Sequence, residues 1–105
     1  MRFTDLLDWL AHPAGTVIRI AFLKEGMDAD KLVTTSPRTF MEKLAEVCQK
    51  ELDYARLFVY LVASALKAKG VRVSPEEWLK AFESDDAGYV VDWLEKLESV
   101  VACQR

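Results

Sequence analysis

Apolar residues recur along most of this chain at the three- and four-residue spacing of an amphipathic helix. The spacing predicts a short helix over residues 5–11, helical structure over 36–69, a helix over 75–82 and a last helix after residue 86. Ser84-Asp85-Asp86 separates the last two, because short polar side chains favour a helix end and a new cap. Residues 26–35 are expected to form a mobile connection with, at most, one helical turn.

The segment of residues 16–25, TVIRIAFLKE, allows two interpretations. Its β-branched residues favour a strand, whereas Val17, Ile18, Ala21 and Phe22 would form a helical stripe. We expect a helix, since no other segment offers a convincing partner strand and a lone strand leaves its backbone groups unpaired.

Residues 36–69 raise the question of one helix or two. Ser36-Pro37 makes a good start, because Ser can cap a helix and Pro at the first helical position loses no needed donor. A polar patch around Gln49 and Lys50 contains no Pro or Gly. The sequence therefore favours one continuous helix, bent near Lys50, with a tight break there as the alternative. At the N-terminal end of the chain, Thr4 is the expected cap of the first helix.

The most apolar stretch of the chain runs from Leu57 to Leu66 without a charged residue. A helix that is apolar on every side needs neighbours on every side. Its end and the next start carry clear signals: Gly70 suits a left-handed cap, and residues 74–77 match a capping box with Pro at the first helical position. Val73 and Trp78 are spaced as a hydrophobic staple.

The fold class that these elements predict is all-α: a compact bundle of five or six helices around a central apolar helix at about residues 52–69. The chain of 105 residues, 51% apolar and 30% charged, fits one domain spanning residues 1–105. No uncharged run reaches the roughly 20 residues that cross a bilayer, and acidic residues interrupt the first fifteen positions. We therefore expect a cytoplasmic protein without a membrane segment, whose two cysteines stay reduced.

Charge is distributed unevenly along the chain. Residues 1–72 contain eleven Lys/Arg and nine Asp/Glu, net +2, whereas residues 73–105 contain three and eight, net −5. An acidic C-terminal third disfavours nucleic acid, which needs several basic contacts on one surface. The alternative hypothesis, a small helical subunit of a nucleoprotein complex, would use the local basic cluster of Arg56, Lys67, Lys69 and Arg72.

Candidate catalytic groups are few. His12 is the only imidazole and stands at a helix end, where capping or exposure is commoner than general-base chemistry. Cys48 lies on an apolar stripe, where burial disfavours the reactive thiolate. The chain lacks the common dinucleotide, phosphate-loop and zinc-protease motifs. We therefore expect no catalytic residues, no metal and no cofactor, and keep an enzyme using His12 or Cys48 only as a remote option.

Several aromatic and apolar side chains fall outside the predicted core stripes, and large apolar groups of this kind are enriched at protein interfaces. An ordinary core with some exposed apolar atoms would explain them equally well. The apolar run 57–66 favours association. The leading hypothesis is therefore a non-enzymatic interaction module, such as a small subunit, adaptor, inhibitor or assembly chaperone. It would bind protein, or self-associate into an oligomer, through apolar and acidic helical surfaces. The candidate interface residues are Trp9, Tyr54, Tyr60 and Val91.

The order of elements from Phe58 to Val101 is an apolar helix, a capped short helix and an amphipathic acidic helix. This order resembles that of the helical phage tail-assembly chaperones. The resemblance covers under half of the chain and includes no diagnostic motif, so it assigns no role to any residue.

Overall fold

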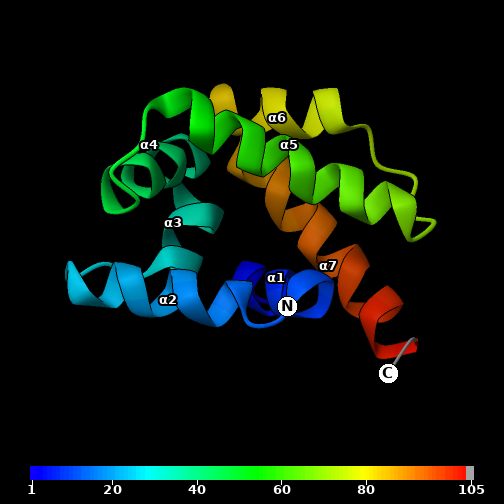
Figure 1. The fold of residues 1–105 in the computed structure, drawn as a ribbon. Coiled ribbons are helices and arrows are strands. Elements are labelled where there is room, and N and C mark those ends of the chain that lie inside the picture. The colour runs from blue at the N-terminus through cyan, green and yellow to red at the C-terminus, as the bar shows by residue number, and fades with distance from the viewer. Residues whose placement is uncertain (104–105) are drawn as a thin grey trace.

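Seven helices make up residues 1–103, the part of the chain that the computed structural model describes (Figure 1). The all-α class is confirmed, and so is the helix across residues 16–25. The number of helices is higher than the five or six expected, because residues 26–35 contain a helix and residues 36–69 contain two. The helices are α1 (Phe3–Ala11), α2 (Ala14–Lys24), α3 (Ala29–Thr35), α4 (Pro37–Val47), α5 (Leu52–Ala68), α6 (Pro75–Glu83) and α7 (Ala87–Cys103).

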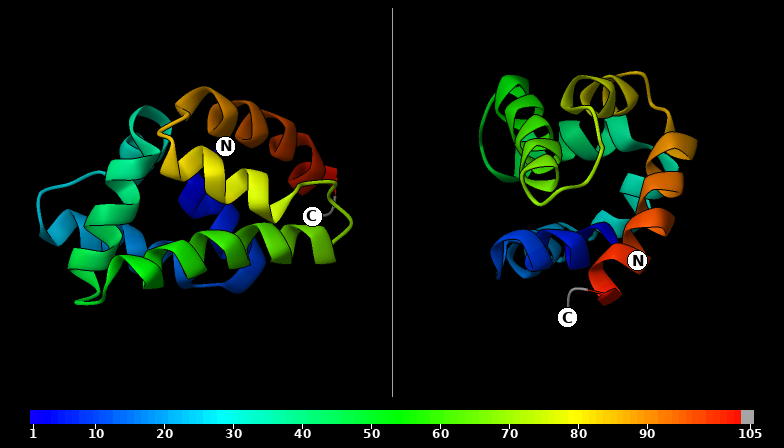
Figure 2. Two further views of the ribbon diagram at one scale, coloured as in Figure 1. Left: turned by 90° about the horizontal axis from the view of Figure 1, so that it is seen from above. Right: turned by 90° about the vertical axis from the view of Figure 1, so that its right-hand side faces the viewer.

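Two helical pairs lie on opposite sides of the core (Figures 1 and 2). The pair α1 and α2 forms one side, and the pair α5 and α6 forms the other. Helices α3 and α4 connect the two pairs at one end of the molecule, and α7 runs from the end of α6 back towards α1. This arrangement leaves α5 at an outer edge, with α4, α6 and α1 as its neighbours.

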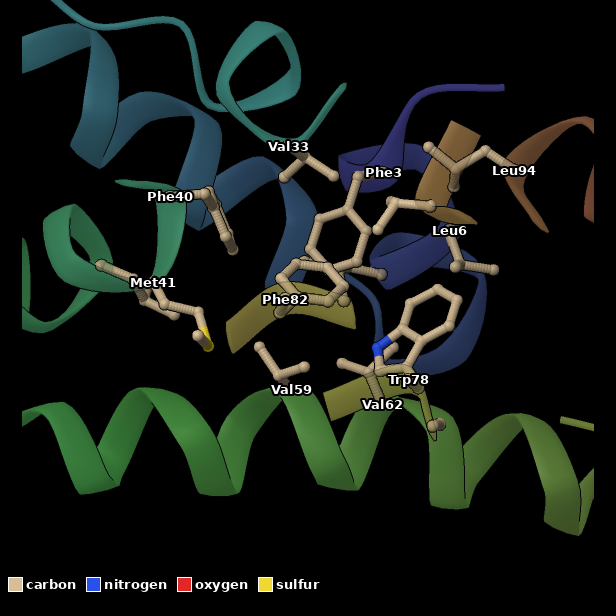
Figure 3. Close-up of a cluster of buried hydrophobic side chains, with 14 of the residues drawn as sticks. Phe3, Leu6, Val33, Phe40, Met41, Val59, Val62, Trp78, Phe82 and Leu94 are labelled. Atoms are coloured by element: carbon tan, nitrogen blue, oxygen red, sulfur yellow. The ribbon is translucent and has the colours of Figure 1, made fainter. Parts of the chain in front are cut away.

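Aromatic side chains from four helices fill the centre of the core, and Figure 3 shows those of α1, α4 and α6. The Phe40 ring stacks on Phe22 and meets the edge of Phe3, with ring centroids 5.4 Å apart in both pairs. Trp78 lies 5.6 Å from Phe82, and all five rings are fully buried. Each such residue buries a large apolar area, so this cluster contributes strongly to holding α1, α2, α4 and α6 together.

The expectation of one continuous helix over residues 36–69 is wrong. Helix α4 ends at Val47, and Gln49 adopts a left-handed conformation with φ of 54°. The Lys50 N–H then donates to the Ala45 carbonyl, and the Gln49 N–H donates to that of Glu46. This is the hydrogen-bond pattern of a Schellman cap, formed without the glycine that usually marks it.

The end of α5 and the start of α6 follow the sequence signals. Gly70 has φ of 92°, and the Val71 N–H donates to the Leu66 carbonyl at 3.1 Å. Ser74 caps α6 by accepting a hydrogen bond from the Glu77 N–H at 3.3 Å. The staple pair, Val73 and Trp78, is buried.

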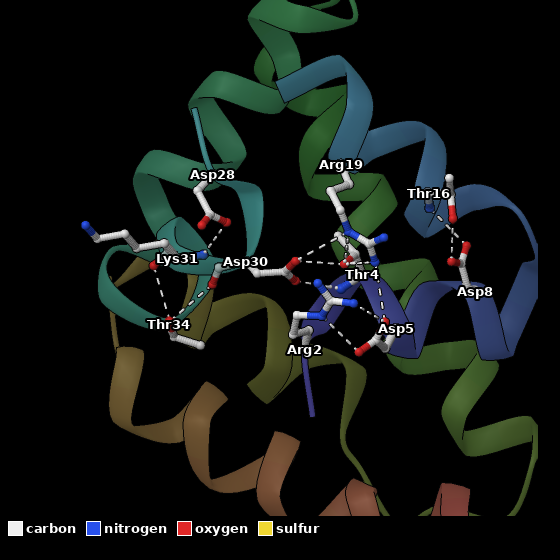
Figure 4. Close-up of polar contacts among 10 residues, drawn as sticks. All are labelled: Arg2, Thr4, Asp5, Asp8, Thr16, Arg19, Asp28, Asp30, Lys31 and Thr34. Atoms are coloured by element: carbon white, nitrogen blue, oxygen red, sulfur yellow. Dashed lines mark hydrogen bonds and ion pairs between the residues drawn. The ribbon is translucent and has the colours of Figure 1, made fainter. Parts of the chain in front are cut away.

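Carboxylates from other helices cap the N-termini of α1 and α2 (Figure 4). Thr4 is not the cap of α1, because it lies inside the helix and is fully buried. The Thr4 N–H and hydroxyl donate instead to Asp30 of α3, at 2.9 and 2.8 Å. In the same way, the N–H and hydroxyl of Thr16 in α2 donate to Asp8 of α1, at 3.0 and 2.7 Å.

The cap of α4 is also supplied from a distance. Ser36 precedes α4 but makes no side-chain cap, contrary to the expectation. Asp85, in the turn before α7, accepts from the Arg38 N–H at 3.2 Å and from the Ser36 hydroxyl at 3.0 Å. A carboxylate near a helix N-terminus is favoured by the unpaired N–H groups and by the helix dipole.

Helices α1 and α2 approach closely at Gly15. A Cβ at this position would overlap the Thr4 carbonyl oxygen and lie 2.7 Å from the Thr4 carbonyl carbon. Arg19, one turn further along α2, donates to the Thr4 hydroxyl at 2.7 Å. Position 15 therefore requires glycine because any larger residue would place a Cβ against the Thr4 backbone, not because the backbone there needs a conformation that only glycine adopts.

Candidate protein-binding surface

The outer face of α5 carries a line of exposed apolar side chains. Tyr54, Leu57 and Leu61 are 44%, 56% and 53% exposed and follow one another at a spacing of three and four residues. Residues at this spacing share one side of a helix. The buried residues of α5, on its opposite side, are Ala55, Val59, Val62, Ala63 and Leu66. Helix α5 is therefore apolar on its core side and on its outer side, and among residues 1–103 only the core side is covered.

Small residues continue the same outer face towards the end of α5. Ser64 and Ala65 are half-buried and Ala68 is exposed. Counting from Leu61, these positions repeat the three- and four-residue spacing. The outer face thus has a bulky half, from Tyr54 to Leu61, and a half with short side chains. We call the whole of it, residues 54, 57, 61, 64, 65 and 68, the α5 face.

Charged groups flank the α5 face on the side of α6. Asp53 accepts from Arg56 at 2.9 Å, and the Arg56 guanidinium lies 3.6 Å from Glu83 of α6. Further along, the Tyr60 hydroxyl donates to Glu76 at 3.4 Å. The pKa of Glu76 is lowered, first by its own backbone N–H and then by the hydrogen bonds from Ser74 and Tyr60. These contacts tie α5 to α6 and leave Leu57 and Leu61 uncovered.

A second exposed apolar line lies on α2 and was missed in the sequence. Val17, Ile20 and Leu23 are 59%, 48% and 63% exposed and share one side of the helix. The predicted stripe of this segment ran through Val17 and Phe22, but only Phe22 is buried. The three-residue spacing from 17 to 23 was the available signal, since it marks a second side of an apolar helix.

The four predicted interface residues lie on three helices. Tyr54 belongs to the α5 face. Tyr60 is half-buried beside α6, and Val91 is half-buried on α7. Trp9 of α1 packs against the core, and the Lys69 ammonium lies 5.0 Å from the centre of its indole ring. Leu57 and Leu61, which belong to the predicted apolar run, are exposed on the outer side of α5.

The four basic residues of the nucleic-acid hypothesis do not form a compact group. Lys67 and Lys69 lie at the end of α5, with Arg72 exposed in the following turn. Arg56 lies eleven residues before Lys67, about 16 Å along the helix axis, and is paired with acidic side chains. Lys69 faces the ring of Trp9. One end of α5 is thus locally basic, while its start is mixed in charge.

The residues considered for catalysis are separated in the fold. His12 is exposed between α1 and α2, and Cys48 is half-buried after α4. Across residues 1–103, no three or more His, Cys, Asp or Glu side chains are placed to hold a metal ion. A shallow groove of about 400 Å³ between α5 and α6 is lined by Tyr60, Leu79 and charged residues.

Comparison with known proteins identifies no relative: no family model, curated protein or solved structure matches this chain. Within the described helices, none is long and apolar enough to cross a membrane.

Proposed function

We propose that this protein is a non-enzymatic interaction module that binds protein through the α5 face. The observation that carries the proposal is the exposure of Leu57 and Leu61 in line with Tyr54. Scattered apolar residues are normal on a protein surface, but an aligned group on one helix face is a feature of binding surfaces. Helix faces of this kind commonly serve as anchors at i, i+3 and i+7 in complexes.

The free energy available on this face is substantial. Covering a fully exposed leucine side chain contributes about 1.5–3 kcal/mol. Leu57 and Leu61 are each about half exposed, so a partner that covers both gains on the order of 2 kcal/mol from them. Tyr54 adds an aromatic ring of the type that is enriched at interface centres. This free energy is large enough to contribute to affinity. Two half-exposed leucines are also compatible with a folded free chain, because apolar atoms are a normal part of protein surfaces.

Acidic residues supply a second kind of surface. Helix α7 carries Asp92, Glu95 and Glu98, all exposed, and Glu98 also accepts a hydrogen bond from the N-terminal ammonium of Met1 at 3.3 Å. Residues 73–105 have a net charge of −5. Such a surface accelerates encounter with a basic protein and repels like-charged ones, with an effect that salt weakens. We propose that α7 selects the charge of a partner, while α5 supplies the apolar contact.

Affinity purification from the organism that encodes the chain tests this proposal. The tagged parent is compared with Leu57→Glu and with Ile20→Glu, which tests the second exposed apolar line on α2. A protein lost in Ile20→Glu but retained by Leu57→Glu would place the binding surface on α2 and contradict the proposal. Both positions are exposed and helical, so both variants should fold like the parent in circular dichroism. We expect a protein retained by the parent and by Ile20→Glu to be lost in Leu57→Glu. Parallel measurement of mass in solution detects self-association. A strictly monomeric chain that retains the same proteins in all three forms would contradict the proposal.

A further inference from the structure

We infer that the link between α4 and α5, residues 48–51, is a hinge through which two copies of the chain exchange their halves. In the exchanged dimer, α4 and α5 of each copy join into one helix over residues 37–68. The first half of one copy, α1–α4, then packs against the second half of the other copy, α5–α7, with the contacts that the single chain makes within itself. The inference uses these buried contacts and not the α5 face, so it does not depend on the proposed function.

The backbone of the link is strained, although its sequence allows a helix. Gln49 has φ of 54°, a left-handed conformation that is unfavourable for a residue with a Cβ. Residues 48–51 include neither Pro nor Gly, the two residues that most oppose a helix. Within the described part of the chain, Glu51 supplies no side-chain cap to α5. In a continuous helix Gln49 leaves the left-handed region, and the first N–H groups of α5 donate to carbonyls four residues earlier.

The apolar pattern of α4 continues into α5 without a change of phase. Apolar residues follow one another from position 41 to position 66 at alternating steps of four and three, which keeps them on one side of a continuous helix. They are Met41, Ala45, Cys48, Leu52, Ala55, Val59, Val62 and Leu66. All are buried except the two in or next to the link, Cys48 and Leu52. A joined helix, about 48 Å long, would thus carry the core sides of α4 and α5 on the same side.

The core is shared between the two halves, and this identifies the partner as a second copy. Phe82 of the second half lies 6.0 Å from Phe3 and 6.4 Å from Phe40 of the first half, measured between ring centroids. Opening the link alone would expose these rings to water, which is unfavourable. A second copy that opens at the same link offers each half the surface from which it was separated, so both cores form again.

The link and the protein concentration decide between the two forms. The buried contacts are the same in both and cancel in the comparison. Exchange relieves the strained link in both copies, and short strained hinges favour it. Association costs the freedom of an independent molecule, so low concentration favours the monomer. Interconversion requires the shared core to separate and should be as slow as unfolding. The dimer should therefore form when concentrated chains refold.

Refolding from urea at about 1 µM and about 500 µM protein, concentrations at which misassembly is observed, tests the inference. Size-exclusion chromatography with light scattering then separates monomer from dimer. We expect a dimer whose fraction rises with concentration and which persists for hours after dilution. A parent that stays monomeric at the higher concentration, or a dimer that dissociates at once on dilution, would overturn the inference.

A matched pair of variants at position 49 tests the hinge itself. Gln49→Gly removes the strain of the left-handed conformation and disfavours a helix through the link, so it should lower the dimer fraction at least about tenfold. Gln49→Ala keeps the strain and favours the helix, so it should raise the dimer fraction. Equal dimer fractions in the parent and in both variants would overturn the inference.

Cross-linking within the isolated dimer shows which halves are paired. The Met1 ammonium of the first half lies 3.3 Å from the Glu98 carboxylate of the second half, so a carbodiimide can join them as an amide while taking up the water that leaves. Isotopically light and heavy chains are refolded together in equal amounts. In exchanged dimers, about half of the linked Met1–Glu98 peptides should combine a light with a heavy partner. Linked peptides of a single label only would overturn the inference.

Further outcomes separate this inference from the proposed function. A dimer that is abolished by Leu57→Glu and unchanged by Gln49→Gly would form through the α5 face, which would overturn the inference and support the proposed function. An exchanged dimer whose bound proteins are unaffected by Leu57→Glu would support the inference and contradict the proposed function.

Discussion

Replacing Gly15 by Ala tests how closely α1 and α2 must approach. In an ordinary helix this change is favourable, because Ala is preferred over Gly by about 1 kcal/mol. Here the added Cβ would overlap the Thr4 carbonyl oxygen and lie 2.7 Å from its carbon. The obstacle is backbone inside a helix, so α2 must move away from α1 rather than a side chain rotate.

The magnitude follows from what that movement disturbs. Overpacking typically costs about 1–3 kcal/mol. The movement also strains the Thr16–Asp8 and Arg19–Thr4 hydrogen bonds, which are worth about 1 kcal/mol each. Set against the helix preference, the net loss for Gly15→Ala is about 2–4 kcal/mol in the free energy of unfolding. At about 4–8 °C per kcal/mol for a domain near this size, the melting temperature should fall by 8 °C or more.

Urea unfolding followed by far-ultraviolet circular dichroism measures the effect, with Gly88→Ala as the matched control. A Cβ at Gly88 would meet only the Asp86 carboxylate, at an ordinary 3.6 Å. Gly88→Ala should therefore be as stable as the parent or up to about 1 kcal/mol more stable. If Gly15→Ala unfolded at the same urea concentration as the parent, the close approach of the two helices would be refuted.

Three further predictions concern the helix ends. Gln49→Gly should stabilise the protein by about 0.5–1 kcal/mol, because Gly adopts the left-handed conformation without strain; an unchanged or lower urea midpoint would argue against the cap after α4. Gly70→Ala should cost about 1–2 kcal/mol from φ alone, since a Cβ there meets nothing within 4 Å, and thermal unfolding measures the loss. The pKa of Asp8 is lowered, first by the hydrogen bond that the Thr16 hydroxyl donates to it. The ionised Asp8 therefore stabilises the folded protein above its ordinary pKa of 3.8. This stabilisation is lost as the pH falls through the lower pKa of the folded state. Acid unfolding should therefore be steeper below about pH 4 in the parent than in Asp8→Asn, and identical acid profiles would exclude this role.

The parts of the fold that were predicted correctly depend on local signals. Gly70 and the box at residues 74–77 act through neighbouring backbone groups, so the sequence around them suffices. One continuous helix over residues 36–69 was preferred, with the break after α4 only as the alternative, because the left-handed residue of that break is Gln49, which does not usually mark a helix end. The caps assigned to Thr4 and Ser36 were wrong for a different reason: the carboxylates that do the capping come from residues distant in sequence.

The candidate surface was predicted only in part. The uncharged run from Leu57 to Leu66 indicated that α5 would be apolar all round, and the structure leaves its outer side exposed. Which side faces the core depends on the packing of α4, α6 and α1, which spacing alone does not reveal. Leu57 and Leu61 are exposed for that reason. Trp9, a candidate interface residue on α1, is half-buried against the core.

The carboxylates that cap helices from a distance couple the formation of those helices to one another. Helix α1 depends on Asp30 of α3, α2 on Asp8 of α1, and α4 on Asp85 before α7. The first turn of each of these helices is therefore stabilised, by about 1 kcal/mol per cap, only when another segment has docked. Folding should therefore be cooperative across the chain, and peptides of the separate helices should be largely unstructured in water. Amide exchange at these first turns would then occur through opening of the whole domain rather than through local fraying.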